Sequence, residues 1–367
     1  MAQPRLFAGL MSGTSLDGVD GVLLALQREH CRVLGHVQRP MPQALRAELA
    51  ALNQRGDDEL HRARLAAAEL TRLYADVLED VLRQAGVAAA QVVAVGAHGQ
   101  TVRHRPDLGY TLQLLAPADL AEACGITVVA DLRSRDVAAG GQGAPLVPAF
   151  HRAVFGRPGA DLAVLNLGGI ANLSLLFGDG RVLGFDCGPG NALLDLWAQQ
   201  RLGRDFDDRG QWAATGSVLP GLLQRLLDDP YFGAPAPKST GRDHFDGAWL
   251  QRRLQGFADA SPQDVQASLA EMVACSIAAE LRRHMPLAEE LLVCGGGWEN
   301  DDLLRRLRRH LGDCRVSDTS RLGLPAQQVE AAAFAWLAAR AIDGLPGNLP
   351  SVTGARGERV LGAIYRA

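Results

Sequence analysis

The chain has 367 residues, of which 47% are hydrophobic and 21% are charged, and its formal net charge is -4. This is the composition of an ordinary globular enzyme, and its slightly acidic balance argues against a nucleic-acid partner. No apolar run reaches the length of a membrane span and the N-terminus lacks a signal-peptide pattern, so we expect a cytoplasmic protein without a membrane partner.

The basic residues and the cysteines exclude further classes of enzyme and of metal or redox site. Lys238 is the single lysine among 37 basic residues. A P-loop NTPase and a protein kinase each need a lysine at a phosphate, in frameworks that do not surround Lys238. The six cysteines form no CxxC pair, so a zinc ribbon and a redox dithiol are both excluded.

The first half of the chain alternates strands with helices. Short apolar runs predict strands, helical spacing of leucine and valine predicts helices, and glycine clusters predict turns. We expect a strand–turn–strand unit, a third strand, a helix, a strand, a second helix, a further strand and a glycine-rich break. These elements lie at 6–10 and 19–26, 32–38, 70–83, 92–97, 116–124, 126–130 and 139–145.

The second half begins as the first did, which is a weak internal repeat. A strand, a Gly168-Gly169 turn and a second strand are followed by a short strand, a tight loop and a helix capped by Asn191. Two such halves predict an α/β protein with domains at 1–157 and 158–367, whose C-terminal segment could pack back on the first domain. The remaining expected elements are 162–167, 173–177, 182–185, 191–200, 262–283, 291–294 and 325–342.

Three glycine-rich turns follow strands and are candidate anion sites, because backbone amides at such turns bind phosphate. In the first, Gly13 permits close approach, while Ser12, Thr14 and Ser15 offer hydroxyl groups and Asp17 could hold a metal-bound water or a substrate hydroxyl. A plain β-hairpin turn uses the same residue types, so that alternative stays open. Together with the turns at 168–172 and 295–297, this pattern favours a nucleotide held between two domains.

Six motifs carry a specific resemblance. They lie at 9–20 (GLMSGTSLDGVD), 98–101 (HGQT), 131–136 (DLRSRD), 140–148 (GGQGAPLVP), 166–172 (NLGGIAN) and 185–191 (FDCGPGN). The chain resembles the anhydro-N-acetylmuramic acid kinases over almost its whole length. Leu132 and Cys187 stand where we expect Phe and Thr in that family.

The resemblance implies the two-domain sugar kinase/Hsp70/actin fold, which is ribonuclease H-like, with an active-site cleft between the domains. It also implies an ATP- and Mg²⁺-dependent reaction, in which water opens the 1,6-anhydro bridge of 1,6-anhydro-N-acetylmuramic acid and O6 takes the γ-phosphoryl group. The products are N-acetylmuramic acid 6-phosphate and ADP, in peptidoglycan recycling. A homodimer fits the family.

The same resemblance assigns Asp186 as the catalytic base, and we take it as the candidate Mg²⁺ ligand, directly or through a water. An aspartate before a helix is also a common cap or turn residue, which is the alternative here. The nucleotide residues it implies are Ser12, Gly13, Thr14, Ser15, Leu16, Asp17, Gly18, Val19, Asp20, Asn166, Gly168, Gly169, Asn172, Gly188, Gly295, Gly296 and Gly297. The sugar residues it implies are Asp17, His98, Gln100, Asp131, Arg133, Arg135 and Glu330.

Several of these residues have a plainer interpretation. Arg133 or Arg135 could pair with the lactyl carboxylate of a muramic sugar, or could belong to an internal ion-pair cluster with its neighbours. Glu330 could orient the sugar or could be a solvated helix carboxylate. His98 could line the sugar pocket or bond to backbone. The arginine run 305–309 is expected to be a solvated helix face.

Two other functions remain open. Another sugar or acyl kinase of the superfamily would deprotonate an intact hydroxyl and consume no water. An actin-like or Hsp70-like ATPase would turn over ATP without sugar, and would form filaments or bind a client protein. Fold similarity cannot choose among the three.

Overall fold

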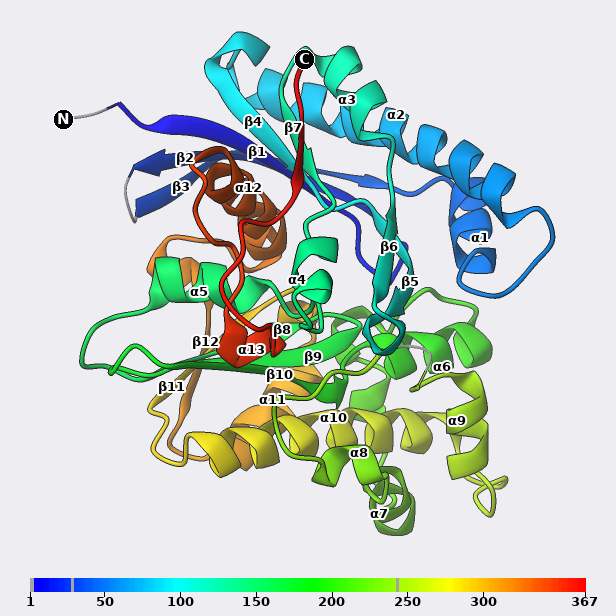
Figure 1. The fold of residues 1–367 in the computed structure, drawn as a ribbon. Coiled ribbons are helices and arrows are strands. Elements are labelled where there is room, and N and C mark those ends of the chain that lie inside the picture. Colours follow the sequence, from blue (N-terminus) through cyan, green and yellow to red (C-terminus); the bar gives the residue numbers. More distant parts are fainter. Residues whose placement is uncertain (1–2, 28–29, 242–243) are drawn as a thin grey trace. The chain divides into compact units, whose positions relative to one another are not determined.

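The structure is a computed structural model that describes residues 3–27, 30–241 and 244–367 (Figure 1). The chain divides into two compact units. Unit 1 contains Met1–Val154 and Gln328–Ala367, and unit 2 contains Phe155–Gln327. The division after residue 154 lies close to the expected boundary after 157, but residues 328–367 group with the first unit. Every helix in the described residues is too short or too polar to cross a bilayer.

Unit 1 is built on one mixed sheet in the order β3-β2-β1-β4-β7-β13. The first three strands form an antiparallel meander, β4 and β7 are parallel to β1, and β13 closes the edge antiparallel to β7. A separate hairpin, β5–β6, follows β4. The strands are β1 (Arg5–Met11), β2 (Gly18–Gln27), β3 (His30–Pro40), β4 (Val92–Ala97), β5 (Gln100–Arg105), β6 (Tyr110–Leu114), β7 (Val128–Ala130) and β13 (Ala363–Tyr365).

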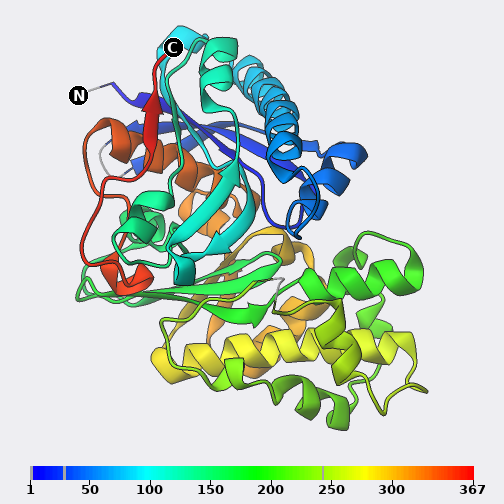
Figure 2. The ribbon, with the colours of Figure 1, turned by 45° about the vertical axis from the view of Figure 1, so that its right-hand side comes forward.

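Helices cover both faces of this sheet. Helix α2 packs on one face, where Val77 and Val81 lie against Gly21 of β2, and α12 packs on the other (Figures 1 and 2). The period-two alternation of β1 and β2 supplies apolar side chains to both faces. The helices of unit 1 are α1 (Gln43–Ala51), α2 (Glu59–Ala85), α3 (Pro117–Cys124), α4 (Ser134–Ala138), α5 (Val147–Phe155), α12 (Val329–Ile342) and α13 (Pro350–Thr353).

Helix α12 lies unusually close to the sheet because two strands present glycine to it. A Cβ atom at Gly9 of β1 would overlap the carbonyl oxygen of Ala331. A Cβ at Gly96 of β4 would overlap the carbonyl oxygen of Phe334. Backbone-to-backbone approach at this distance tolerates no side chain, so these glycines place α12.

Unit 2 repeats the sheet of unit 1. Its order is β10-β9-β8-β11-β12, with an antiparallel meander of the first three strands and two further strands parallel to the first. This duplicated strand order confirms the predicted α/β fold class and the internal repeat. The strands are β8 (Leu162–Leu167), β9 (Ile170–Leu176), β10 (Val182–Pro189), β11 (Glu290–Cys294) and β12 (Arg315–Asp318).

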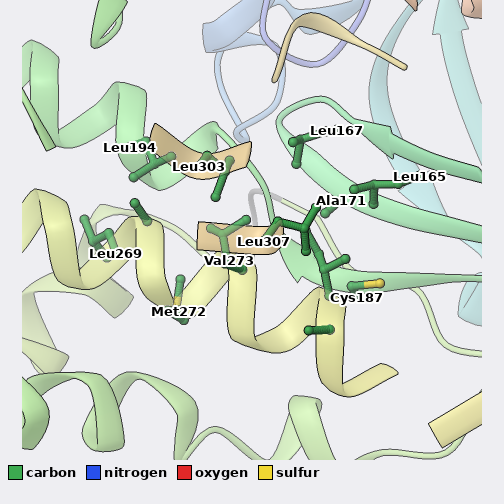
Figure 3. Packing of buried hydrophobic residues seen from close by; sticks show 14 of the residues in the cluster. Leu165, Leu167, Ala171, Cys187, Leu194, Leu269, Met272, Val273, Leu303 and Leu307 are labelled. Atoms are coloured by element: carbon green, nitrogen blue, oxygen red, sulfur yellow. The ribbon is translucent and has the colours of Figure 1, made fainter. Parts of the chain in front are cut away.

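The core of unit 2 lies between its sheet and helix α10. Figure 3 shows leucine, alanine and cysteine side chains of β8, β9 and β10 converging on Met272 and Val273 of α10 and on Leu303 and Leu307 of α11. The burial of these apolar side chains is the main driving force for the folding of this unit. The helices are α6 (Ala192–Leu202), α7 (Pro220–Leu227), α8 (Pro230–Gly233), α9 (Gly247–Arg253), α10 (Pro262–His284) and α11 (Asp301–Leu311).

Three local expectations are wrong. Asn191 does not cap α6 through its side chain, which donates instead to the carbonyl of Leu167 at 3.4 Å. Strand β10 continues through Pro189 with a β-bulge after Asp186, where we expected a loop. Arg306, expected on a solvated face, is 3% exposed and pairs with Glu271 and Asp302.

The packing of α12 generates a stability prediction. We expect Gly96→Ala to lower the free energy of unfolding by about 3 kcal/mol, because the added methyl group pushes α12 from the sheet. Urea unfolding followed by circular dichroism measures the change. Gly233→Ala is the matched control, since a Cβ there meets no atom within 4 Å. Equal stability of the two variants would contradict the close approach.

Candidate active site

The first glycine turn connects β1 and β2, which pair antiparallel with Met11 opposite Asp20. The backbone therefore forms the strand–turn–strand unit that the sequence predicts. Leu16 has a φ of 58°, in the left-handed region that bulky residues rarely adopt. The exposed Asp17 accepts hydrogen bonds from the Ser15 hydroxyl at 2.6 Å and from the Gly18 amide at 3.0 Å.

Ser12 is buried, and its hydroxyl is used inside unit 1. It donates to the carbonyl of Gly99 at 3.1 Å and accepts from the Tyr74 hydroxyl at 2.9 Å. Burial raises the pKa of Tyr74, so this phenol stays a donor. A phosphate contact by Ser12 would thus use its backbone amide. Thr14 is exposed at the tip of the turn.

The end of β4 brings two expected sugar residues beside this turn. Gln100 is 1% exposed, and its amide Nε2 donates to the carbonyl of Gly13 at 3.1 Å. This contact leaves its Oε1 as a buried acceptor without a partner among the described residues. His98 is 5% exposed and binds the carbonyl of Ser12 and the guanidinium of Arg133.

The other members of the expected nucleotide set in β2 have structural partners. Val19 is fully buried in the core of unit 1. Asp20 lies 3.2 Å from the Nε2 of His36 on the neighbouring strand β3. Gly18 pairs with Pro40, and a Cβ there would overlap the carbonyl of Arg39. These three residues therefore help to shape the hairpin that carries the turn.

The segment after β7 separates the four charged residues that the sequence grouped. Asp131 is exposed with a φ of 53°, and its carboxylate accepts from the Ser134 amide at 3.4 Å, at the start of α4. Arg135 is exposed and Arg133 is half-buried. Asp136 is fully buried, and its carboxylate accepts hydrogen bonds from Asn348, Thr353 and the amide of Gly143. The alternative of an ion-pair cluster therefore does not hold for Asp136, which ties the C-terminal segment to the rest of unit 1.

Glu330 lies in the first turn of α12, because residues 326–328 form a separate 3-10 turn before it. It directly precedes Ala331, whose carbonyl touches Gly9 of β1. Its carboxylate is half-buried. The helix start is therefore held against the sheet, and Glu330 has a defined position within unit 1.

In unit 2, three expected residues form a polar row across the sheet. Asn166 of β8 pairs with Asn172 of β9, which in turn pairs with Asp186 of β10. Directly opposite residues of antiparallel strands point to the same face. In the sequence these residues are up to twenty positions apart, and each lies at or beside the end of an expected strand. The pairing places two amides and one carboxylate side by side.

Asp186 is held at both its backbone and its side chain. Its Oδ2 accepts from the Thr240 amide at 2.9 Å. Its backbone amide donates to the carbonyl of Lys238 at 2.9 Å, and its carbonyl accepts from the Tyr231 hydroxyl at 2.8 Å. A β-bulge follows it and re-aims the strand, as bulges next to active sites do. The carboxylate is 9% exposed, so its orientation is well constrained.

The segment that contacts Asp186, from Tyr231 to Thr240, is held in place by Lys238, the single lysine of the chain. Lys238 forms a buried ion pair with Glu280 of α10 at 2.9 Å, and both side chains are 5% exposed. Its ammonium also donates to the carbonyl of Tyr231 at 3.0 Å. The sequence around Lys238 argues against a phosphate ligand but does not indicate this ion pair, and it does not indicate the contacts of Tyr231 and Thr240 with Asp186. A lone lysine in a Pro-rich segment was the only available signal.

The remaining glycine turns pack against this row. Gly168 and Gly169 accept backbone hydrogen bonds from Asn191 and Gly190 through their carbonyls, at 2.9 and 2.8 Å. Gly188 has a φ of 136°. A Cβ at Gly295 would lie 2.6 Å from Oδ1 of Asn166, and one at Gly297 would overlap Leu167, whereas one at Gly296 meets nothing within 4 Å. At positions 295 and 297 the close packing therefore leaves room only for glycine. Gly296 is the exposed glycine of the three.

One further group of possible metal ligands is formed by Glu271, Cys275 and His310, whose ligand atoms lie within 4.8 Å of one another. Arg306 and Arg309 both bind the Glu271 carboxylate. Two guanidinium groups on one carboxylate disfavour a cation there. Burial, followed by the charge of Glu271, raises the pKa of the Cys275 thiol to about 11, which disfavours the thiolate.

We expect the charge pair of Lys238 to matter for stability. Lys238→Met should lower the free energy of unfolding by about 3 kcal/mol, because it leaves the Glu280 carboxylate buried without its main partner. The double variant Lys238→Met/Glu280→Met should recover most of this loss. Urea titration of both proteins measures it. Equal loss in the single and double variants would contradict the pairing.

His98 predicts a pH dependence of stability. Burial, followed by the positive charge of Arg133, lowers the pKa of His98 to about 3, and burial lowers that of His151 to about 3. Unfolding lets both residues take up a proton below pH 6.5, so stability falls as pH drops. Each contributes a slope of about 1.4 kcal/mol per pH unit. His98→Gln should remove half of this slope between pH 6.5 and 5, in urea unfolding at several pH values. An unchanged slope would contradict the buried neutral imidazole.

Comparison with known proteins identifies the family. A protein 58% identical over 372 residues is the anhydro-N-acetylmuramic acid kinase of Variovorax paradoxus, with 99% of each chain covered. The enzymes of that name from Bordetella petrii and Cupriavidus pinatubonensis are 57% and 54% identical, with 99% of this chain and 97% and 99% of theirs covered. Residues 5–367 match the family described as anhydro-N-acetylmuramic acid kinase, and the chain belongs to that family.

Proposed function

We propose that this protein is an ATP-dependent kinase that opens 1,6-anhydro-N-acetylmuramic acid with water and phosphorylates O6. The products are N-acetylmuramic acid 6-phosphate and ADP, and the reaction serves peptidoglycan recycling. The observation that carries the proposal is the held carboxylate of Asp186 in a polar row, in a chain that matches this kinase family from residue 5 to residue 367.

Asp186 is the proposed base for the hydrolytic half of the reaction. The attacking water loses a proton to the carboxylate as its oxygen bonds to the anomeric carbon, and the bond from that carbon to O6 breaks. The amide of Thr240 fixes Oδ2, so the carboxylate keeps one orientation through the reaction. The backbone bonds to Lys238 and Tyr231 hold the strand while the proton moves.

The phosphoryl half transfers the γ-phosphoryl group of ATP to the departing O6. Positioning dominates this step, and the glycine turns of both units offer backbone amides for phosphate oxygens. The proposed nucleotide residues are those that the resemblance implies. Of these, Thr14 is exposed at the tip of its turn, and Gly296 is exposed at the start of a 3-10 helix. Ser12, Gly295 and Gly297 mainly support the turns.

The donors of the polar row fit Mg²⁺. Asp186 offers a carboxylate, and Asn166 and Asn172 offer amide oxygens beside it. Mg²⁺ prefers oxygen ligands, few of them carboxylates, and keeps several waters. When bound, the cation would neutralise charge on the transferred phosphoryl group. Asp186 is the residue proposed to hold it, directly or through a water.

The proposed sugar residues belong to unit 1. Gln100 has the clearest support, because its buried Oε1 lacks a partner among the described residues and a sugar hydroxyl or amide would satisfy it. Arg133 and Arg135 are candidates for the lactyl carboxylate. Asp17, Asp131 and Glu330 are proposed to accept hydrogen bonds from sugar hydroxyl groups.

We also propose a cytoplasmic homodimer. All six cysteines are free thiols, as is usual in a reducing compartment where ATP is also available. Two-fold dimers are the commonest soluble oligomers. Light scattering on the purified protein tests the assembly.

The test of function is substrate-dependent ADP release with product mass analysis in ¹⁸O-labelled water. We expect turnover with the anhydro sugar and a product that gains one phosphoryl group and one labelled oxygen. Turnover of N-acetylmuramic acid without label would favour a conventional sugar kinase instead. ATP turnover without any sugar would favour an actin-like or Hsp70-like ATPase.

Asp186→Asn tests the assigned base. We expect kcat to fall by about a hundredfold to ten-thousandfold, because the amide cannot accept the proton of the attacking water. Asp313→Asn is the matched control, since Asp313 is exposed in a turn. Wild-type turnover by Asp186→Asn, with normal folding and ATP binding, would remove the assignment.

A further inference from the structure

Both ring nitrogens of His98 are engaged inside unit 1. Nδ1 lies 3.1 Å from the carbonyl oxygen of Ser12. Nε2 lies 3.1 Å from Nε and 2.9 Å from Nη2 of Arg133. A carbonyl only accepts and a guanidinium only donates, so Nδ1 carries the proton and Nε2 is the acceptor. The ring therefore has no polar atom left for a sugar.

We propose that His98 is a positioning residue, which fixes the guanidinium of Arg133 so that it can bind an anionic oxygen group of a substrate. This inference rests on the proposed function, which places Arg133 at the sugar. It assigns His98 an indirect role in place of the direct sugar contact that the resemblance implies.

The surroundings of His98 hold its ring in one orientation. The side chain is 5% exposed, and its ring centroid lies 4.7 Å from that of Phe334 on α12. Its backbone amide donates to the carbonyl of Leu10 on β1 at 3.0 Å. The imidazole is thus fixed by the sheet and by the helix that packs on it, and cannot rotate away from Arg133.

Arg133 has a second anchor on a different segment. Its Nη1 donates to the carbonyl of Gly143 at 2.7 Å, while Nε and Nη2 face His98. Gly143 in turn donates its amide to the buried carboxylate of Asp136 at 2.8 Å. Two anchors on opposite sides define the plane of the guanidinium. A planar fork held in this way loses less side-chain entropy when it binds a carboxylate or a phosphate.

The charge state of His98 suits this role. Burial and the adjacent guanidinium lower its pKa to about 3, so the ring is a neutral acceptor at physiological pH. A protonated ring would turn its Nε2 into a donor and would repel Arg133. A histidine that worked as a general acid or base near neutral pH would need a pKa close to 7, and therefore surroundings that do not disfavour its protonated form.

Two substitutions separate the two hydrogen bonds of His98. In His98→Gln, the side-chain oxygen can reach the position of Nε2 and still accept from Arg133. In His98→Asn, the shorter amide can reach the position of Nδ1 and still donate to Ser12, but it cannot reach Arg133. Each is made alone and with Arg133→Ala, and KM is measured separately for the anhydro sugar and for ATP.

We expect His98→Asn to raise one KM by about tenfold or more, since a hydrogen bond to a charged group is lost. His98→Gln should restore most of the wild-type value, and kcat should change less than KM in both. In the Arg133→Ala background, His98→Asn and His98→Gln should have the same KM, and neither should raise KM above that of Arg133→Ala alone. The KM that rises tells whether the anion belongs to the sugar or to ATP.

The proposal would be overturned if His98→Asn raised KM by the same factor in the wild-type and Arg133→Ala backgrounds. It would also be overturned if KM of His98→Gln were as high as KM of His98→Asn. A measurement on the wild-type protein guards against misfolded variants. Imidazole ¹⁵N shifts should show His98 neutral with its proton on Nδ1 at pH 7, and any other state would also overturn the proposal. Lack of anhydro-sugar turnover by the wild type would instead count against the proposed function alone.

Discussion

The close approach of helix α12 to the sheet of unit 1 is the constraint on which much of this unit depends. Gly9 and Gly96 remove the side chains that would keep the helix away. The helix carries Glu330 in its first turn and packs Phe334 against His98. A segment that begins more than three hundred residues into the chain thereby completes the fold of the N-terminal unit.

Three candidate binding residues in unit 1, Ser12, His98 and Arg133, are joined by hydrogen bonds. The carbonyl of Ser12 binds His98, His98 binds Arg133, and Arg133 binds the carbonyl of Gly143. Each step joins the ends of different elements, so a shift in one strand would move the guanidinium. Buried polar networks are costly when a member is unsatisfied, which favours a single arrangement. The turn after β1 and the arginine before α4 therefore have a fixed geometry relative to each other.

Unit 2 uses the same strand order for different chemistry. Its first hairpin turn has Gly168 and Gly169 where unit 1 has serine and threonine, and its polar atoms come from Asn172 and Asp186 on the adjacent strands. The Asp186 carboxylate is oriented by a segment that Lys238 anchors to α10. A duplicated sheet thus supports a hydroxyl-rich turn in one half and a held carboxylate in the other.

The sequence by itself determined most of the strands, the glycine turns, the α/β class and the family resemblance, because side-chain alternation, glycine and short motifs are local properties. It also pointed to Asp186 through its motif. It did not indicate the hairpin β5–β6 or the edge strands β12 and β13. Only the tertiary structure decided which residues of the C-terminal segment belong to unit 1, that Asn172 lies beside Asp186, and that His98 contacts Arg133 instead of presenting a free nitrogen. These facts depend on strand register and on contacts between distant segments, and a burial pattern along one strand carries no information about its neighbours.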